Sequence, residues 1–497
     1  MTDQMYQLIA IIIYMAGMLV IGWYAYRRTT NLTDYMLGGR SLGPAVTALS
    51  AGAADMSGWL LMGLPGAIFV KGLGEVWIAI GLTIGAYLNW LFVAPRLRMY
   101  TQVSSNSITI PSYLDSRLKQ NSSVLRIVTA LIILVFFTFY VSSGMVAGGV
   151  FFENSFHMNY HTGLLLVSAV VIGYTLFGGF LAVSYTDFVQ GLIMFLALIL
   201  VPLIGIFVTG GFTETVQSIH TVKPHALSLV GGVTAAGIIS SVAWGLGYFG
   251  QPHIIVRFMA IKTVGETKQA RRIGIGWMFL SLAGATATAL VGIAYFQQHP
   301  EVVFKNPETV FIALGQILFH PFVAGVLLAA VLAAVMSTIS SQLIVTSSAL
   351  VEDLYKYLYR LVKKQDAPDA QYVLLGRLAI LAVSVIAMIF AWQQNDTILS
   401  LVSFAWAGFG AAFGPTILLT LYWRKITSSG ALIGMIVGAV TVVIWHYTGL
   451  TKQLYEIVPG FALNLIVTMI VSLVTYKPNK AIDAEFDETL KLLKTEK

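Results

Sequence analysis

The chain repeats one feature along almost its whole length: apolar runs of close to twenty residues, separated by short polar segments. A helix needs about 20 mostly apolar residues to cross a bilayer, so each of these runs is a candidate membrane span. Only 10% of the 497 residues are charged, whereas soluble domains average about 25% and need that polar surface to stay in water. The sequence therefore predicts an all-α integral membrane protein.

Thirteen runs are long enough to be candidate spans, and no long polar stretch divides them into two domains. They cover residues 5–26, 44–70, 75–95, 126–153, 162–181, 188–210, 232–258, 274–297, 321–347, 373–393, 397–421, 429–448 and 456–476. We predict a single membrane domain over residues 1–476 and a short cytoplasmic tail over residues 477–497. The first run follows Asp3 and precedes Arg27 and Arg28, a charge order that indicates a retained span rather than a cleaved signal peptide.

The basic residues are divided unequally between the two sets of loops that thirteen spans would create. Only Lys71, Lys223, Lys305 and Lys452 fall in one set, and all the other lysines and arginines fall in the second set or at its helix ends. Because lysine and arginine favour cytoplasmic loops, we predict an outside N-terminus and a cytoplasmic C-terminus. This topology also explains the formal net charge of +7 without a nucleic-acid partner.

Several classes of function are excluded by what the sequence lacks. It contains no G-x-x-x-x-G-K-[ST] motif, so the chain has no nucleotide-driven motor of its own. It has no cysteine, which excludes disulfides, thiolate catalysis and cysteine-bound metals. A G-x-G-x-x-G match, Gly245–Gly250, lies inside a predicted span rather than in a strand-to-helix turn, so it does not indicate a dinucleotide site. A carrier or channel is therefore favoured over a membrane enzyme.

Two predicted spans contain glycine-rich interruptions. The second holds "SAGAADMSGWLLMGLPG" (Ser50–Gly66) and the seventh holds "SSVAWGLGYFGQPH" (Ser240–His253). Unwound backbone at membrane depth is tolerated only where its free amides and carbonyls line a cavity or are buried in protein. Each interrupted span opens a block of five, which suggests an inverted repeat over about residues 44–210 and 232–421 with its binding sites at the midplane. Close helix packing through small residues is the alternative for either segment.

The first interruption carries a lone carboxylate, Asp55, with no basic residue within ten positions. A carboxylate at the centre of a span costs about 2.5–3.5 kcal/mol even on insertion scales, so a functional role is expected. The ninth span contains "AAVMSTISSQLIVTSS", in which Ser337 and Thr338 lie one turn after Ala334 on the same helix face. Hydroxyls, carbonyls and one carboxylate are the oxygen ligands that a hard cation such as sodium prefers.

A small zwitterionic solute would fit beside such a cation site. Half-helix N-termini at the interruptions carry free amides and partial positive charge, which suit a carboxylate. Trp244, Tyr248 and Tyr140 could enclose a small apolar ring and hold a cationic amine against their faces. Each of the three could also be a packing or interface residue.

The chain resembles the sodium/solute symporter family over nearly its whole length. The resemblance rests on "YMLGGRSLGPAVTALSAGAADMSGWLLMGLPGA", "GGFLAVSYTDFVQ", "AWGLGYFGQPHI", "LAAVMSTISSQL", "VEDLY" and "SFAWAGFGAAFGP", which occur in order. It implies a leucine-transporter-like five-plus-five inverted repeat with one extra helix in front and two behind. It also implies sodium-coupled symport of L-proline into the cell by alternating access, in a bacterial plasma membrane, with sodium as co-substrate and no resident cofactor.

The resemblance also implies roles for individual residues. The sodium site would use Ala53, Met56, Ala334, Ser337 and Thr338, with Asp55 required for coupling. The substrate pocket would involve Ser57, Gly58, Tyr140, Trp244, Tyr248 and Pro252. Arg40 and Asp187 would lie in cytoplasmic loop motifs and affect transport without contacting substrate.

Three alternatives remain open from the sequence. The chain could carry another small solute, such as a sugar, a carboxylate or an inorganic anion. It could be a receptor that keeps the carrier fold without turnover, or a sodium channel uncoupled from any solute. Ala54 stands where the family's members commonly have serine, which leaves the sodium affinity open.

Overall fold

The computed structural model describes residues 2–27, 32–119, 124–365, 367–394 and 396–496. Over these residues the fold is helical and contains no strand, apart from one isolated bridge between Leu42 and Ile261. Ten helices of the described chain are long and apolar enough to cross a membrane, and eleven if a bent helix pair is counted as one span. The all-α membrane class expected from the apolar runs is confirmed.

The long helices are listed here by their bounds. They are α1 (Asp3–Tyr26), α5 (Val76–Leu88) continuing through a π turn into α6 (Ala94–Val103), α8 (Val124–Phe156), α9 (Tyr160–Val208), α13 (Thr267–Gln298), α15 (Pro321–Ser348) continuing into α16 (Lys356–Lys363), α17 (Asp369–Ala391), α18 (Ile398–Tyr422), α19 (Ser428–Tyr447) and α20 (Ile457–Thr475). Two further apolar segments are interrupted, and the first of them is the bent pair that would be an eleventh span. One consists of α3 (Pro44–Asp55), a π turn η2 (Trp59–Gly63) and α4 (Leu64–Lys71), and the other of α11 (Ala235–Val242), a 3-10 segment η5 (Ala243–Gly250) and α12 (Pro252–Ala260).

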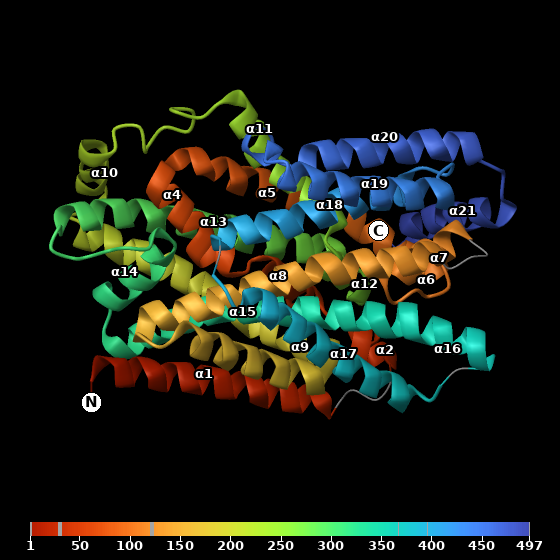
Figure 1. Cartoon of the computed structure of the whole chain (residues 1–497), viewed down its shortest axis with the longest axis horizontal. Coiled ribbons are helices and arrows are strands. Elements are labelled where there is room, and N and C mark those ends of the chain that lie inside the picture. Colours follow the sequence, from red (N-terminus) through yellow and green to blue (C-terminus); the bar gives the residue numbers. More distant parts are fainter. Residues whose placement is uncertain (1, 28–31, 120–123, 366, 395, 497) are drawn as a thin grey trace.

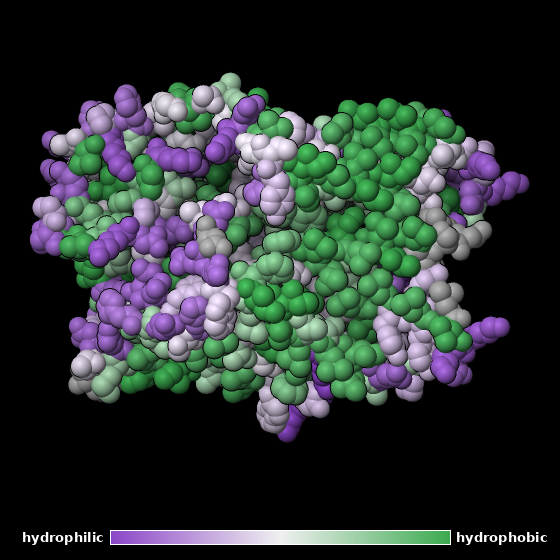
Figure 2. Space-filling model, in the orientation of Figure 1, coloured by the Kyte–Doolittle hydropathy of each residue, from purple (hydrophilic) through white to green (hydrophobic). Residues whose placement is uncertain are grey.

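Short helices gather at the two ends of the bundle. The end that holds the N-terminus carries α10 (Phe212–Val222) and α14 (Val310–Leu318), at the left of Figure 1. The opposite end carries α7 (Ile110–Leu118) and α21 (Lys480–Thr495), beside α6 and α16. In Figure 2 a broad hydrophobic area covers the middle of the molecule, and hydrophilic residues lie towards both ends. This is the distribution expected for a bundle that crosses a bilayer.

The predicted spans 162–181 and 188–210 lie in α9, whose two helical halves meet at a kink at Gly179 with no loop over residues 182–187. Its backbone leaves the helical region only at Gly179, where φ is 59°. A side chain at that position would be strained and would lie 2.6 Å from the Tyr35 ring, so only glycine fits. The expected loop between these spans, which was to hold Asp187, is therefore wrong. The polar residues of this stretch are buried in the helix and form hydrogen bonds within the protein, as the Ser184 hydroxyl does to the Phe180 carbonyl at 2.8 Å.

The centre of the bundle is formed by α15 and α18, whose side chains are buried along most of their lengths. The helix α15 packs against α1, α3, α8, α9 and α17, and α18 packs against η5, α8, α19 and α20. Both interrupted spans therefore lie against a continuous buried helix.

Candidate functional site

The second span is broken where the sequence predicted. The helix α3 ends at Asp55, the backbone unwinds at Met56 and Ser57, and the second half, Trp59–Lys71, lies at an angle of 62° to α3. The Asp55 carbonyl accepts hydrogen bonds from the Ser57 amide at 2.9 Å and from the Trp59 indole at 3.1 Å. The break is buried throughout, so its remaining polar groups face protein and not lipid.

One face of α15 brings two hydroxyls to this break. The Ser337 hydroxyl donates to the Ala53 carbonyl at 2.7 Å and lies 3.1 Å from the Ala334 carbonyl. The Thr338 hydroxyl lies 3.4 Å and 3.3 Å from the same two carbonyls. Four buried oxygens from two elements therefore lie together, and all four belong to residues named in the sodium prediction. Each hydroxyl has lone pairs that it can turn towards a cation, so this group can hold a hard ion.

The Asp55 carboxylate forms its hydrogen bond on another side of the break. One oxygen accepts from the Tyr248 hydroxyl, and Oδ1 has no partner among the described residues. With Asn89 and Met278, Asp55 and Tyr248 line a space of about 20 Å³, enough for about one water molecule. The structure thus brings Asp55 and Tyr248 together, although the sequence had assigned them to different ligands.

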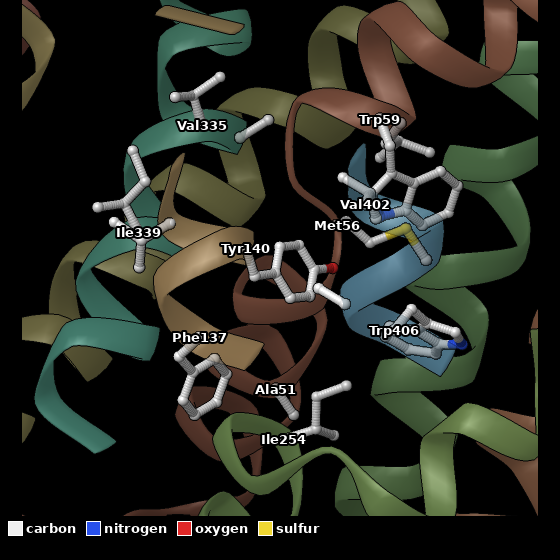
Figure 3. Close-up of a cluster of buried hydrophobic side chains, with 14 of the residues drawn as sticks. Ala51, Met56, Trp59, Phe137, Tyr140, Ile254, Val335, Ile339, Val402 and Trp406 are labelled. Atoms are coloured by element: carbon white, nitrogen blue, oxygen red, sulfur yellow. The ribbon is translucent and has the colours of Figure 1, made fainter. Parts of the chain in front are cut away.

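Met56 caps the end of α3 and is buried. Its amide donates to the Gly52 carbonyl at 2.9 Å, and its side chain lies beside Trp59 and Val402 in Figure 3. The side chain therefore helps to pack the break against α18.

Two of the aromatic residues of η5, Trp244 and Tyr248, are arranged around Trp406 of α18. Trp244 stacks on Trp406 and on Tyr455, with ring centroids 6.4 Å and 5.3 Å apart. Tyr248 meets Trp406 edge-on at 5.1 Å. The Trp406 indole donates to the Trp244 carbonyl at 2.8 Å. Trp406 was not among the residues predicted for the site, and its only signal in the sequence is the motif "SFAWAGFGAAFGP" around it.

Tyr140 reaches the break from α8. Its hydroxyl points towards the unwound part of α3 in Figure 3 and has no hydrogen-bond partner among the described residues. Its ring meets the imidazole of His253 edge-on at 5.7 Å. His253 is fully buried, and neither ring nitrogen has a partner in the described chain. These two residues leave polar atoms available beside the break.

The remaining residues expected at the substrate pocket lie at the two interruptions. The Ser57 hydroxyl accepts a hydrogen bond from the Trp59 amide at 3.4 Å, at the start of the second half of the broken span. A Cβ at Gly58 would lie 3.0 Å from Ala147 and 3.3 Å from Val335. Glycine at this position therefore lets α8 and α15 pack closely against the break. Pro252 is the first residue of α12 and lines a separate space of about 10 Å³.

Arg40 lies outside this site, at the end of the molecule that carries α6 and α7. Its guanidinium donates to the Met259 and Ser107 carbonyls, both at 2.7 Å, and to Thr101 and Asn106. Burial, with Arg98 nearby, lowers the pKa of Arg40 to about 10, and the group stays protonated at neutral pH. Arg40 thus ties the end of α12 to the segment between α6 and α7.

Asp187 forms a fully buried network with Arg257 of α12. The Arg257 guanidinium lies 3.2 Å from the Asp187 carboxylate and 2.6 Å from the Ser341 hydroxyl. The Ser50 hydroxyl of α3 donates to the same carboxylate oxygen at 2.8 Å. Four elements, α3, α9, α12 and α15, therefore meet at one ion pair. Arg257 lies at the end of the predicted span 232–258 and is one of the helix-end basic residues of the sequence; a cation within a predicted span is the signal for such a buried partner.

Comparisons with known proteins agree with this architecture. Residues 35–438 match the model of the sodium:solute symporter family. The high-affinity proline transporter PutP of Bacillus subtilis (strain 168) is 61% identical over 471 residues, which cover 95% of this chain and 98% of that protein. The osmoregulated proline transporter OpuE of the same organism is 55% identical and covers 99% of each chain. A sodium-coupled sialic acid symporter of known structure shares the fold, with a TM-score of 0.81 at 20% identity over 96% of this chain and 99% of that chain.

Proposed function

The chain belongs to the sodium:solute symporter family, whose members are transporters and not enzymes, and from that membership we propose that it carries L-proline into the cell together with sodium. The named relatives that match almost the whole chain are proline transporters, which favours proline over sugars, carboxylates and inorganic anions. Alternating access across a bacterial plasma membrane is the proposed mechanism, with sodium as co-substrate.

The observation that carries this proposal is the meeting of the α3 break with α15. A sodium ion there would be held by the carbonyls of Ala53, Met56 and Ala334 and by the hydroxyls of Ser337 and Thr338. Each of the two hydroxyls already lies 2.7–3.4 Å from the Ala53 and Ala334 carbonyls. Because the ligands come from two elements, binding of the ion would hold the break against α15 and so favour one arrangement of the bundle over another.

Asp55 would supply the charge that a set of neutral oxygens lacks. Its carboxylate is bonded to Tyr248, which belongs to the other interrupted span. When the Asp55 carboxylate turns from Tyr248 towards an incoming sodium ion, the positions of both interruptions would therefore change. We propose that this link couples sodium binding to substrate binding, so that each raises the affinity for the other.

Proline would bind beside the break. The N-terminal end of the second half-helix, at Ser57 and Gly58, suits its carboxylate. The rings of Tyr140, Trp244 and Tyr248 would enclose the pyrrolidine ring. Pro252, the first residue of α12, would set the direction in which the chain leaves the pocket. The space at Asp55 is only about 20 Å³, so we expect the helices around the break to separate when proline enters.

Finer features of the fold belong to the same proposal. We propose thirteen spans, which requires the bent pair, the interrupted α11–α12 segment and the two halves of α9 each to count as spans. We propose a five-plus-five inverted repeat over about residues 44–210 and 232–421, preceded by one helix and followed by two. The excess of basic residues on one set of loops supports an outside N-terminus and a cytoplasmic C-terminus.

Counterflow of labelled L-proline in proteoliposomes tests the proposal. An inward sodium gradient should drive accumulation of proline, and replacing sodium by choline should abolish it. An excess of unlabelled L-proline should compete, whereas leucine and phenylalanine should not. Sodium flux without proline would indicate a channel, and equal competition by leucine would contradict the proline assignment.

A further inference from the structure

A cavity of about 630 Å³ lies at the end of the molecule that carries α6 and α21. Its wall is formed by the α5–α6 span, the first turns of α13 and the last turns of α21. Four basic residues line it, Arg96, Lys268, Arg271 and Lys494, together with aromatic surface from Trp90 and Phe92. No acidic residue lines it in the described part of the chain. The cavity thus combines positive charge with apolar surface.

The four cations of this cavity have no carboxylate partner within 4.0 Å among the described residues, whereas other cations at the same end are paired. Arg126 pairs with Asp353, and Arg424 pairs with Asp487. Arg96 instead donates one hydrogen bond, to the Leu421 carbonyl at 2.8 Å. The remaining positive charge in the cavity is available for an anion from outside the protein.

The C-terminal helix α21 completes the wall. Its Phe486 meets Tyr100 of α6 edge-on at 6.3 Å, and its Glu485 pairs with Lys119. Leu493 of α21 is buried, while Lys494, the next residue, lines the cavity. The segment that the sequence predicted to be a simple tail is therefore a docked helix that contributes both apolar and basic groups.

An apolar groove between α5 and α13 runs along both helices away from this cavity. It has a volume of about 470 Å³ and is lined by residues such as Ile84, Phe279 and Ala283. Phe279 is eight residues from Arg271, which is about 12 Å along a helix. Half of a bilayer's hydrocarbon core is about 15 Å deep. An acyl chain whose head group lies in the basic cavity would therefore reach the near end of the groove.

We propose that this cavity binds an anionic phospholipid from the leaflet that meets this end of the molecule. The phosphate would lie among Arg96, Lys268, Arg271 and Lys494, and the acyl chains would pass Trp90 and Phe92 towards the groove between α5 and α13. Basic pockets between spans on the cytoplasmic side are suited to anionic head groups. The lipid would join α21 to α6 and α13, so it should stabilise the docked position of the C-terminal helix.

The test uses the full chain in a neutral detergent, with phosphatidylglycerol and phosphatidylcholine of the same acyl chains as probes. Native mass spectrometry measures lipid binding, and the melting temperature reports stabilisation. We expect phosphatidylglycerol to bind more tightly than phosphatidylcholine and to raise the melting temperature. The double variant K268Q/R271Q should weaken phosphatidylglycerol binding by about 30-fold, as expected for the loss of two basic side chains near a membrane surface.

The matched control is K262Q/R272Q, which removes two exposed charges at the same end, beside the cavity but outside its lining. It should bind phosphatidylglycerol like the unmodified protein, and both double variants should melt alike without lipid. The proposal would be overturned if the control lost as much phosphatidylglycerol binding as K268Q/R271Q, or if the unmodified protein bound the two lipids equally. Displacement of phosphatidylglycerol by inorganic phosphate at the same concentration would also overturn it, because the site would then recognise free phosphate.

Discussion

The break between α3 and η2 and the 3-10 segment η5 both lie in glycine-containing stretches, and each interrupts an apolar helical segment. Their surroundings differ. The α3 break faces hydroxyls from α15 at 2.7–3.4 Å from the Ala53 carbonyl. The glycines of η5 instead face backbone and rings: a Cβ at Gly245 would overlap the Gly81 carbonyl, and a Cβ at Gly247 would overlap the Trp406 indole. One interruption presents polar ligands, and the other allows close packing.

This difference explains why the same residue type is used for two purposes. At η5, glycine lets α5 and α18 approach closely enough to hold Trp244 and Tyr248 in fixed positions. At the α3 break, unwinding places Asp55 and its neighbours where α15 and Tyr248 can reach them. The hydrogen bond between Tyr248 and Asp55 joins the two interruptions. The tightly packed η5 segment therefore positions Tyr248 against the carboxylate of the α3 break.

The largest effect is expected at the charge of the α3 break. Asp55→Asn should reduce sodium-dependent proline uptake by about 100-fold or more, because loss of a buried charge interaction costs about 3 kcal/mol. The asparagine can still accept the hydrogen bond from Tyr248, so the protein should fold. Uptake assays at several sodium concentrations, with protein yield and melting temperature as controls, check this. Unchanged sodium dependence would remove Asp55 from the coupling.

A second prediction concerns folding at η5. Gly247→Ala should destabilise the protein by about 1–3 kcal/mol, the usual cost of overpacking a tight interface, because the added methyl overlaps the Trp406 indole. Gly276→Ala on α13 is the matched control, since a Cβ there meets nothing within 4 Å. Melting temperatures in detergent should separate the two variants. Equal melting temperatures would show that close packing of η5 against α18 does not stabilise the protein.

A third prediction tests whether the aromatic residues of η5 select the substrate. Trp244→Ala should weaken proline uptake by about tenfold and let larger amino acids compete, since filling or emptying such a pocket changes discrimination by about 1–3 kcal/mol. The sodium concentration for half-maximal uptake should change little. Competition by unlabelled amino acids measures the effect. If uptake falls only because less protein folds, with selectivity intact, Trp244 is a packing residue.

The smallest effect is expected from a single hydroxyl. Thr338→Ala should raise the sodium concentration for half-maximal uptake by about fivefold, which corresponds to about 1 kcal/mol. Thr338→Ser should largely restore it, and Thr346→Ala should have no effect, because the Thr346 hydroxyl bonds within its own helix to Gln342 at 2.7 Å. Similar behaviour of the alanine and serine variants at position 338 would exclude hydroxyl coordination there.

The sequence predicted the elements of this site better than their contacts. The break at Asp55 followed from glycine, proline and a lone carboxylate in one span, and the face shared by Ala334, Ser337 and Thr338 followed from helical spacing. The bond between Asp55 and Tyr248 could not be predicted, because it depends on how two interrupted spans pack in space. For the same reason a loop was expected at Asp187, where long-range pairing with Arg257 keeps polar residues inside a helix.

The direct test of the account is the equilibrium binding of radiolabelled sodium to the purified protein. We predict saturable binding by the unmodified chain and at least about tenfold weaker binding by Ser337→Ala, which loses the hydroxyl closest to the Ala53 carbonyl. Ser347→Ala should bind like the unmodified chain, because this buried hydroxyl of α15 bonds to the Gly376 carbonyl, away from the break. Sodium binding that is equally strong in Ser337→Ala would contradict a sodium site between the α3 break and α15.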